Sequence, residues 1–362
     1  MNILYLTAIA GRKHAGPTYT IPKRLEAQAK LDSVYWVNLC PVEDESMFDK
    51  NIYHYSAPQS FKLSQLPEPF NHPDIVVFEE FFKKEFVFVA NQIKKAKIPY
   101  ITIPSCQMTD KYLENKRFKK MVFSKLFFSR FAKDAASVQF LSEQEFKDSR
   151  TYYKGHSFIA GNGTDLHSIS SHAQREQIIG VFVGRYNVWQ KGLDLLMDAL
   201  AKRHSELAKA NIRFEMYGPE SPSGTAEEII KLVNERNLED IVGVNGAVFD
   251  TAKEKVLMDA DFFVHTSRFE GMPMAVLEAL SYGLPCLLTQ GSNMREDVEE
   301  YNAGWGADTD VNSIVNAIDN LIKDVNNLSE KKANAMELAK KHTWDNIAQL
   351  SHKTFVELTG KQ

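Results

Sequence analysis

Short apolar runs rich in β-branched and aromatic residues alternate with amphipathic helical segments along the whole of this 362-residue chain. Most of these runs are apolar at every position, which is typical of parallel strands buried on both faces. The runs predicted as strands in the first half are residues 2–7, 34–39, 75–80, 100–104 and 136–142. Those in the second half are residues 178–184, 213–218, 241–246, 261–267 and 285–290. Because the alternation occurs twice, it predicts an α/β fold of two doubly wound, Rossmann-like domains.

A polar stretch over residues 166–177 separates the two halves. It contains no strand pattern and precedes a strong predicted strand at Ile178. We therefore expect a first domain over residues 1–168 and a second domain over residues 169–342. The last segment, 343–362, predicts an amphipathic helix that can pack back on the first domain.

Amphipathic periods between the apolar runs predict the helices. They lie at residues 21–31, 83–97, 116–133, 192–209, 226–237, 252–259 and 273–282. Thr225 and Glu228 have the spacing of a capping box at the start of one of these helices.

Composition excludes several classes of protein. No apolar run approaches the roughly 20 residues that a membrane-spanning helix needs, and the N-terminal stretch lacks the basic region of a signal peptide. The three cysteines, Cys40, Cys106 and Cys286, are far apart and fit neither a metal site nor a disulfide framework, so a reduced, cytoplasmic setting is expected. The net charge of −4 argues against a dedicated nucleic-acid-binding protein.

The clearest candidate site lies in the segment 261–290. There a predicted strand leads into a loop with Glu270, and a helix follows from about Pro273. Such a loop lies at the edge where open α/β sheets bind ligands, and the positive end of the helix favours a phosphate or a polar sugar. Glu278 lies about one and a half turns into this helix. The carboxylates of Glu270 and Glu278 can therefore contact different parts of one extended ligand. The alternative is a solvated loop carboxylate and an ordinary helical glutamate.

Two cations flank the loop that follows the predicted strand 178–184. Arg185 and Lys191 can together neutralise a diphosphate at this strand end without a metal ion. The alternative is that both are solvated, as most surface cations are. Gly192 is interpreted as a glycine at a helix start.

These residues resemble the family 4 retaining glycosyltransferases of the GT-B fold, which belong to the glycosyl transferases group 1. The sequence "VGR" is followed by "KG" and then by a paired-glutamate motif, E-x7-E, formed by Glu270 and Glu278. "NGTD" at 162–165 and "MYGPES" at 216–221 resemble two further family motifs in the expected order. The resemblance covers most of residues 159–350, whereas the N-terminal half matches mainly in layout.

The resemblance implies catalytic and donor-binding roles for these residues. Glu270 would hold hydroxyls of the donor sugar, and Glu278 would hydrogen-bond the ribose. Arg185 and Lys191 would stabilise the charge that develops on the departing nucleoside diphosphate. The backbone amides that would contact the sugar and the phosphates lie around Gly271, Met272 and Pro273.

Glycines and nearby backbone would shape the rest of the nucleotide site. The resemblance assigns this role to Gly218 and to the backbone from Gly246 to Val248. In the first domain, Gly16 lies in a loop that resembles the family's glycine loop facing the diphosphate, where only glycine allows a close backbone approach. A plain turn at Gly16 is the alternative, and His14 in the same loop is a weaker candidate for ligand contact.

The sequence departs from the family at one position. Many relatives carry a histidine after the fourth strand of the first domain, where this chain has Ser105 and Cys106. We therefore assign no catalytic base. In the front-face mechanism usually proposed for retaining enzymes of this fold, a donor phosphate oxygen accepts the acceptor's proton. Cys106 is interpreted as a packed thiol, and His265 as a structural residue.

A basic and aromatic segment over residues 111–133 is the other lead. Eight Lys/Arg residues interleave there with Phe, Leu, Met and Val, and Glu114 is its single acid. Such a helix can lie on an anionic membrane surface. It can equally pack its aromatic side chains inward and expose its lysines, which is the commoner case.

The resemblance implies an enzyme that transfers a sugar with retention of anomeric configuration. The donor would be a nucleoside diphosphate sugar, with a UDP-sugar favoured, and the transferred group a hexosyl or N-acetylhexosaminyl unit. The resemblance implies that the first domain binds the acceptor and the second domain binds the nucleotide sugar. The acceptor would be a hydroxyl of a glycan, a lipid-linked glycan or a protein, in cell-surface polysaccharide or glycoconjugate synthesis. No metal ion or other cofactor is expected. The absent histidine motivates an alternative, a non-catalytic nucleotide-sugar-binding partner subunit; an epimerase or phosphorylase is a third interpretation.

Overall fold

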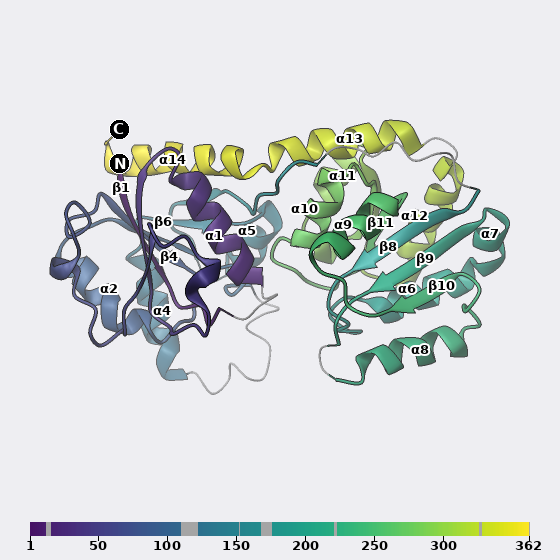
Figure 1. Cartoon of the computed structure of the whole chain (residues 1–362), viewed down its shortest axis with the longest axis horizontal. Coiled ribbons are helices and arrows are strands. Elements are labelled where there is room, and N and C mark those ends of the chain that lie inside the picture. The colour runs from purple at the N-terminus through teal and green to yellow at the C-terminus, as the bar shows by residue number, and fades with distance from the viewer. Residues whose placement is uncertain are drawn as a thin grey trace. The chain divides into compact units, whose positions relative to one another are not determined.

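The chain forms two α/β units, each built around a parallel sheet (Figure 1). The structure, a computed structural model, describes residues 1–11, 16–109, 122–151, 153–167, 176–220, 223–325 and 328–361. The first unit comprises Met1–Gly163 together with Trp344–Gln362, and the second comprises Thr164–Thr343. The division thus lies a few residues before the boundary expected at 168/169, and the C-terminal helix belongs to the first unit.

The first unit has a seven-stranded sheet whose described pairings are all parallel. Its strands, in spatial order, are β3 (Tyr53–Tyr55), β2 (Ser33–Asn38), β1 (Asn2–Thr7), β4 (Ile75–Glu79), β5 (Tyr100–Ile103), β6 (Ser137–Phe140) and β7 (Ser157–Ile159). Its helices are α1 (Gly16–Gln28), α2 (Phe86–Lys95), α4 (Val122–Lys133), α5 (Glu143–Ser149) and α14 (Trp344–Thr359). Apolar side chains such as Leu4, Phe78 and Phe131 fill the space between strands and helices.

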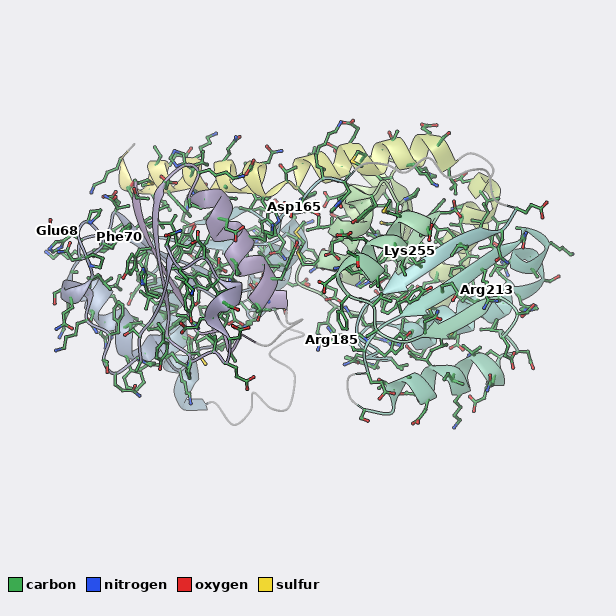
Figure 2. The ribbon with its side chains drawn as sticks, viewed as in Figure 1. Glu68, Phe70, Asp165, Arg185, Arg213 and Lys255 are labelled. Carbon is green, nitrogen blue, oxygen red and sulfur yellow. The ribbon has the colours of Figure 1, made fainter. Side chains whose placement is uncertain are left out.

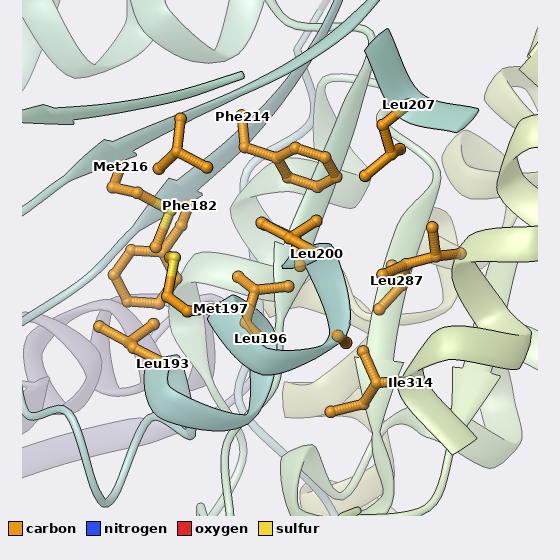
Figure 3. Packing of buried hydrophobic residues seen from close by; sticks show 14 of the residues in the cluster. Phe182, Leu193, Leu196, Met197, Leu200, Leu207, Phe214, Met216, Leu287 and Ile314 are labelled. Carbon is orange, nitrogen blue, oxygen red and sulfur yellow. The ribbon is translucent and has the colours of Figure 1, made fainter. Parts of the chain in front are cut away.

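The second unit has a six-stranded parallel sheet. Its strands, in spatial order, are β10 (Val242–Asn245), β9 (Ile212–Tyr217), β8 (Ile178–Val183), β11 (Phe262–His265), β12 (Cys286–Thr289) and β13 (Gly304–Ala307). Its helices are α6 (Leu193–Lys202), α7 (His204–Lys209), α8 (Thr225–Glu235), α9 (Asp250–Asp259), α10 (Met274–Ser281), α11 (Arg295–Glu300), α12 (Val311–Asp324) and α13 (Leu328–Lys341). Figure 3 shows Leu196 and Leu200 of α6 packed in the core near Phe214 of β9.

The strands predicted from continuous apolar runs all occur, with ends that differ by a residue or two. The sequence did not indicate β3, β7 or β13, because these strands are very short and β13 contains two glycines. The helices α5, α11, α12 and α13 were also not predicted. The helix expected over 192–209 is two helices, α6 and α7, which Arg203 separates.

The capping box predicted at Thr225 and Glu228 is wrong. The N-cap of α8 is Gly224, with φ of 86°, and Thr225 is the first helical residue. The carboxylate of Glu220 instead accepts hydrogen bonds from the amides of Gly224, at 3.2 Å, and Ala226, at 3.3 Å. An acidic group brought in from the preceding loop therefore does what the capping side chain was expected to do.

The described end of the basic segment packs into the first unit. Phe128 and Phe131 of α4 are buried in its core, whereas the Arg130 side chain is 80% exposed. This end therefore has the ordinary amphipathic arrangement. The remainder of the segment up to Met121, like His14, lies outside the described residues. Among the helices that the structure describes, none combines the length and apolar character needed to span a bilayer.

The sheet order of the second unit positions the candidate site. From β8 the chain first adds β9 and β10 on one side and then β11, β12 and β13 on the other. The loops after β8 and β11 therefore diverge from neighbouring strand ends, at the point where the order reverses. Open α/β sheets bind their ligands at such a point.

Candidate active site

Two loops of the second unit, residues 184–192 after β8 and 266–273 after β11, are held together by backbone contacts. Thr266 Oγ1 donates to the carbonyl oxygens of Lys191, at 3.2 Å, and Gly192, at 3.1 Å. Gly192 has φ of 60°, and a Cβ there would lie 2.1 Å from the Thr266 carbonyl oxygen. Only glycine allows this approach of the two loops, so the expected glycine at a helix start also brings the loops together.

Lys191 and Glu270, which the sequence placed in different motifs, form a buried ion pair. Lys191 Nζ lies 2.5 Å from Glu270 Oε1, and the two side chains are only 11% and 13% exposed. Ser267 Oγ also donates to Oε1, at 2.8 Å. Among the described residues, the hydrogen bonds to this carboxylate all use Oε1. Oε2 is therefore left to accept hydrogen bonds from a ligand.

Glu270 is ionised at neutral pH. Burial by itself raises the pKa of a carboxyl, but the Lys191 charge and the hydrogen bond from His265 outweigh it and lower the pKa of Glu270 to about 2. The site thus holds a fixed negative oxygen next to a fixed cation. This pair can accept from sugar hydroxyls on one side and attract an anionic group on the other.

His265 is part of this site as well as of the strand β11. Its Nε2 lies 2.9 Å from Ser267 Oγ and 3.3 Å from Glu270 Oε1. Because the Ser267 hydroxyl donates to Glu270, it accepts from Nε2, which therefore carries the proton. Burial, and after it the Lys191 charge, lowers the pKa of His265, so the ring is neutral at pH 7. The structural role expected for His265 is thus the support of Glu270.

Asn293 holds the Glu270 loop from the segment after β12. Its Nδ2 donates to the carbonyl oxygens of Glu270, at 2.6 Å, and Gly271, at 2.9 Å. Thr289 Oγ1 donates to the Ser267 carbonyl oxygen at 2.7 Å. The sequence analysis missed both residues, although Thr289 at the end of a predicted parallel strand and Asn293 shortly after it were a usable signal.

Glu278 lies on α10 and faces α9. Its Oε1 accepts from Lys253 Nζ at 2.7 Å, and the Glu278 side chain is 19% exposed. Lys253 was not singled out from the sequence. The helix α10 begins at Met274, with Pro273 as its N-cap, one residue later than the expected start. Its first amides point toward the same strand ends as Glu270, where they favour an anion.

Arg185 differs from Lys191 in its surroundings. Its side chain is exposed (Figure 2), and no described residue forms a hydrogen bond or ion pair with its guanidinium group. It follows β8 directly, so it stands at the same strand end as the Lys191 loop. The two cations therefore have unequal tasks, since Lys191 is held by Glu270 and Arg185 can reach a ligand from solvent.

The glycine positions fall into two groups. A Cβ at Gly218 would lie 1.8 Å from the Gly184 carbonyl oxygen, so glycine is needed where the loops after β8 and β9 meet. At Gly246, in the loop after β10 that also contains Val248, a Cβ would meet open space. Gly16 begins α1 in the first unit, where a Cβ would meet no described atom within 4 Å, and its predicted approach to the diphosphate stays a prediction.

The position of the absent histidine has an unusual backbone. Ser105 and Cys106 have φ of 49° and 64°, a left-handed backbone conformation that residues other than glycine rarely adopt. The Cys106 amide donates to Glu145 Oε1 at 2.5 Å, and the Leu141 amide donates to Oε2 at 2.7 Å. Burial raises the pKa of Glu145 to about 7. In the first unit, a buried carboxyl thus holds the loop after β5.

A sequence profile described as glycosyl transferases group 1 matches residues 177–324, which lie within the second unit and contain every site residue of this unit named above. The match covers less than half of the chain, so it is residues 177–324 that resemble the glycosyl transferases group 1. The chain's two parallel sheets with surrounding helices have the architecture of GT-B glycosyltransferases.

Curated glycosyltransferases match parts of the chain. An uncharacterized glycosyltransferase of Methanocaldococcus jannaschii is 27% identical over 200 residues, which are 52% of this chain and 48% of that protein. A poly(ribitol-phosphate) alpha-N-acetylglucosaminyltransferase of Staphylococcus aureus is 32% identical over 126 residues, which are 34% of this chain and 23% of that protein. The chain thus spans about half the length, or less, of these relatives.

Solved structures resemble the fold over nearly the whole chain. The Anabaena protein HepE, solved in complex with UDP and glucose, superposes with a TM-score of 0.71 at 17% identity. The match covers 99% of this chain and 100% of that chain. At this identity the likeness concerns the fold.

Proposed function

We propose that this protein is a retaining glycosyltransferase of family 4. It takes a hexosyl or N-acetylhexosaminyl group from a UDP-sugar and transfers it to a hydroxyl of a glycan or glycoconjugate in polysaccharide synthesis. One observation carries the proposal: the buried Lys191–Glu270 pair at the strand ends of β8 and β11, beside the first turn of α10.

The pair suits the two halves of a nucleotide sugar. Glu270 Oε2 accepts from hydroxyls of the sugar, while Lys191 and Arg185 bind the diphosphate. Glu278, which Lys253 holds at 2.7 Å, accepts from the ribose hydroxyls. The open backbone at Gly246 and Val248 lines the nucleoside.

The relatives support the choice of donor and pathway. The structural neighbour HepE was solved with UDP and glucose, and the relative from Staphylococcus aureus transfers N-acetylglucosamine to poly(ribitol-phosphate), as their names state. The first name supports a UDP-linked donor, and the second supports transfer of an N-acetylhexosamine to a polymer that carries hydroxyl groups. We therefore rank UDP-sugars first among donors and glycan hydroxyls first among acceptors.

Retention fits a site without a side-chain base. In the proposed step, the bond between the sugar's anomeric carbon and the diphosphate breaks, and the acceptor oxygen bonds to that carbon on the same face. The acceptor's proton passes to the departing phosphate oxygen. Lys191 and Arg185 balance the charge that develops there, which is electrostatic stabilisation of the transition state without a metal ion.

The test combines donor binding with transfer. Thermal melting with UDP, GDP and their sugars identifies the donor, because a ligand of the folded state raises the melting temperature. Transfer from that donor to a panel of saccharides, with and without EDTA, then measures turnover and metal dependence. We expect Glu270→Ala to lower turnover by about a hundredfold or more, as a loss of about 3 kcal/mol at the transition state implies.

Glu330→Ala, at an exposed position on α13 of the same unit, is the matched control. Normal turnover of Glu270→Ala would remove Glu270 from the site, and an inverted product would overturn retention. Donor binding without transfer to any acceptor would favour the alternative function, a non-catalytic nucleotide-sugar-binding partner subunit.

A further inference from the structure

Trp189 is the most exposed large hydrophobic side chain among the described residues. It is 63% exposed, whereas the other three tryptophans of the chain, Trp36, Trp305 and Trp344, are at most 5% exposed. An indole ring left in water at this position loses the stabilisation that burial gives the others. The exposed indole ring is therefore a candidate surface for binding a ligand.

The loop under Trp189 is rigidly held. The Trp189 carbonyl oxygen accepts from the Gly192 amide at 3.2 Å and from Arg268 Nη1 at 2.6 Å. One residue later, the Gln190 carbonyl oxygen accepts from the Arg268 amide at 2.8 Å. The backbone that carries the ring is thus held in place before any ligand binds. Preorganisation of this kind lowers the entropy cost of binding.

The groups around the ring are those that recognise a sugar. The Arg268 guanidinium lies over the indole, 5.6 Å from its centroid, and the Phe269 ring lies 5.9 Å away. Asp194 accepts two hydrogen bonds of 2.7 Å from Arg268, which fixes the guanidinium. A flat aromatic face beside charged hydrogen-bonding groups matches a pyranose, which has an apolar C–H face and a polar rim of hydroxyls.

The ring also stands next to the proposed site of chemistry. Trp189 precedes Lys191 by two residues, and Phe269, which its ring contacts, directly precedes Glu270. Lys191 and Glu270 are nearly buried, whereas Trp189 is exposed. A sugar on the indole therefore lies on the solvent side of a donor held by the pair. An acceptor that approaches this pair from solvent would pass the ring.

We propose that Trp189 is a stacking platform for a pyranose ring of the acceptor, with Arg268 and Asp194 at its polar edge. This proposal rests on the proposed function, and it makes Trp189 a determinant of acceptor specificity and not of donor binding. It commits to a carbohydrate acceptor, so the acceptor hydroxyl belongs to a sugar residue.

The first test uses the fluorescence of Trp189 itself. Because the other tryptophans are buried, iodide quenches mainly Trp189 in the full-length chain. Methyl glucoside, methyl galactoside, methyl N-acetylglucosaminide and their β- and α-linked disaccharides are added with UDP present. We expect at least one saccharide to lower the quenching constant, and we expect UDP alone to leave it unchanged. Protection by the nucleotide sugar alone, or by no saccharide, overturns the proposal.

The second test separates acceptor from donor by kinetics. Trp189→Ala should raise the acceptor KM about tenfold, equivalent to about 1.4 kcal/mol, while the donor KM stays unchanged. Trp189→Phe keeps an aromatic face and should restore most of the affinity. Phe88→Ala, which removes another exposed aromatic ring from α2, is the matched control and should change neither constant.

The outcomes distinguish this proposal from the proposed function. A donor KM that rises with Trp189→Ala shows that the loop orients the donor and overturns the acceptor platform. Unchanged acceptor kinetics in Trp189→Ala also overturn it, although donor binding and Glu270-dependent turnover would still support a glycosyltransferase. If UDP-sugars neither stabilise the chain nor turn over, the proposed function itself fails.

Discussion

Glu270 keeps its charge in the interior of the second unit because neighbouring donors replace the water that burial removes. Lys191, Ser267 and His265 converge on a single carboxylate oxygen. Burial raises the pKa of Glu270, but Lys191 and His265 outweigh it and lower this pKa to about 2. The same convergence leaves the second oxygen for a ligand. Because its Oε1 is held by neighbouring side chains, the Glu270 carboxylate is fixed in position while Oε2 can bind a ligand.

The Glu270 charge should make stability depend on pH in a defined range. The folded pKa of about 2 lies below the ordinary value of 4.5, so the ionised carboxylate stabilises the fold above pH 4.5, and this contribution is lost as pH falls toward 2. Glu270→Gln leaves Lys191 buried and unpaired, so we expect a loss of about 3 kcal/mol in the free energy of unfolding at pH 7. Urea unfolding of the wild-type chain and of Glu270→Gln at pH 7, 4.5 and 3 measures this difference in the free energy of unfolding.

The difference between the wild-type chain and Glu270→Gln should shrink between pH 4.5 and pH 3. Glu330→Gln, at an exposed position, should change stability little at any pH. A difference that stays constant from pH 7 to pH 3 would show that the ion pair does not depress the Glu270 pKa.

At the scale of elements, the segment between β12 and α11 holds the loop that carries Glu270. Asn293 adopts φ of 60°, and its side-chain amide bridges the carbonyl oxygens of Glu270 and Gly271. Thr289 binds the same loop at Ser267. The loop that carries Glu270 is therefore held from β8 on one side and from β12 on the other.

Asn293→Ala should lower kcat clearly while it changes the melting temperature little. It removes both hydrogen bonds to the Glu270 loop, so we expect kcat to fall about tenfold, as a misplaced catalytic group implies. Asn237→Ala is the matched control, because Asn237 also has a positive φ, of 52°, and lies after α8. Steady-state kinetics and thermal melting of both variants check this. Equal kcat in the two variants would show that Asn293 has no positioning role.

The sequence predicts individual elements of the site better than their assembly. Continuous apolar runs indicated the strands β8 and β11, and turn and helix signals placed Lys191 and Glu270 directly after them. Nothing in the local pattern shows that β8 and β11 are neighbours, so the contact between residues 79 positions apart was not predictable. Asn293 and Lys253 were missed for the same reason, because their roles depend on sheet order and helix packing. Glu220 took the place of the predicted capping box because its carboxylate accepts from the amides of Gly224 and Ala226 at the start of α8.

At the scale of the whole molecule, the first unit is completed by the last helix of the chain. Phe355 of α14 is buried, and the Trp344 ring packs so closely on Gly163 that a Cβ there would lie 2.5 Å from it. Helix α14 also packs on α1. The first unit therefore depends on residues that follow the entire second unit in the sequence.

Phe355→Ala should destabilise the first unit by about 3–5 kcal/mol, because it opens a cavity in a packed core. Leu350→Ala on the same helix is the matched control, since Leu350 is 49% exposed. Calorimetry of the two variants measures the shift. Equal melting temperatures would show that α14 contributes no core to the first unit.

The second unit is an insertion whose two ends meet. Thr164 and Thr343 form a parallel bridge, and the Thr164 amide donates to the His342 carbonyl oxygen at 2.7 Å. During synthesis, the ribosome therefore finishes the inserted unit while the unit that began first still lacks α14. The face of α1 that α14 covers therefore stays exposed until residues 344–359 have been made.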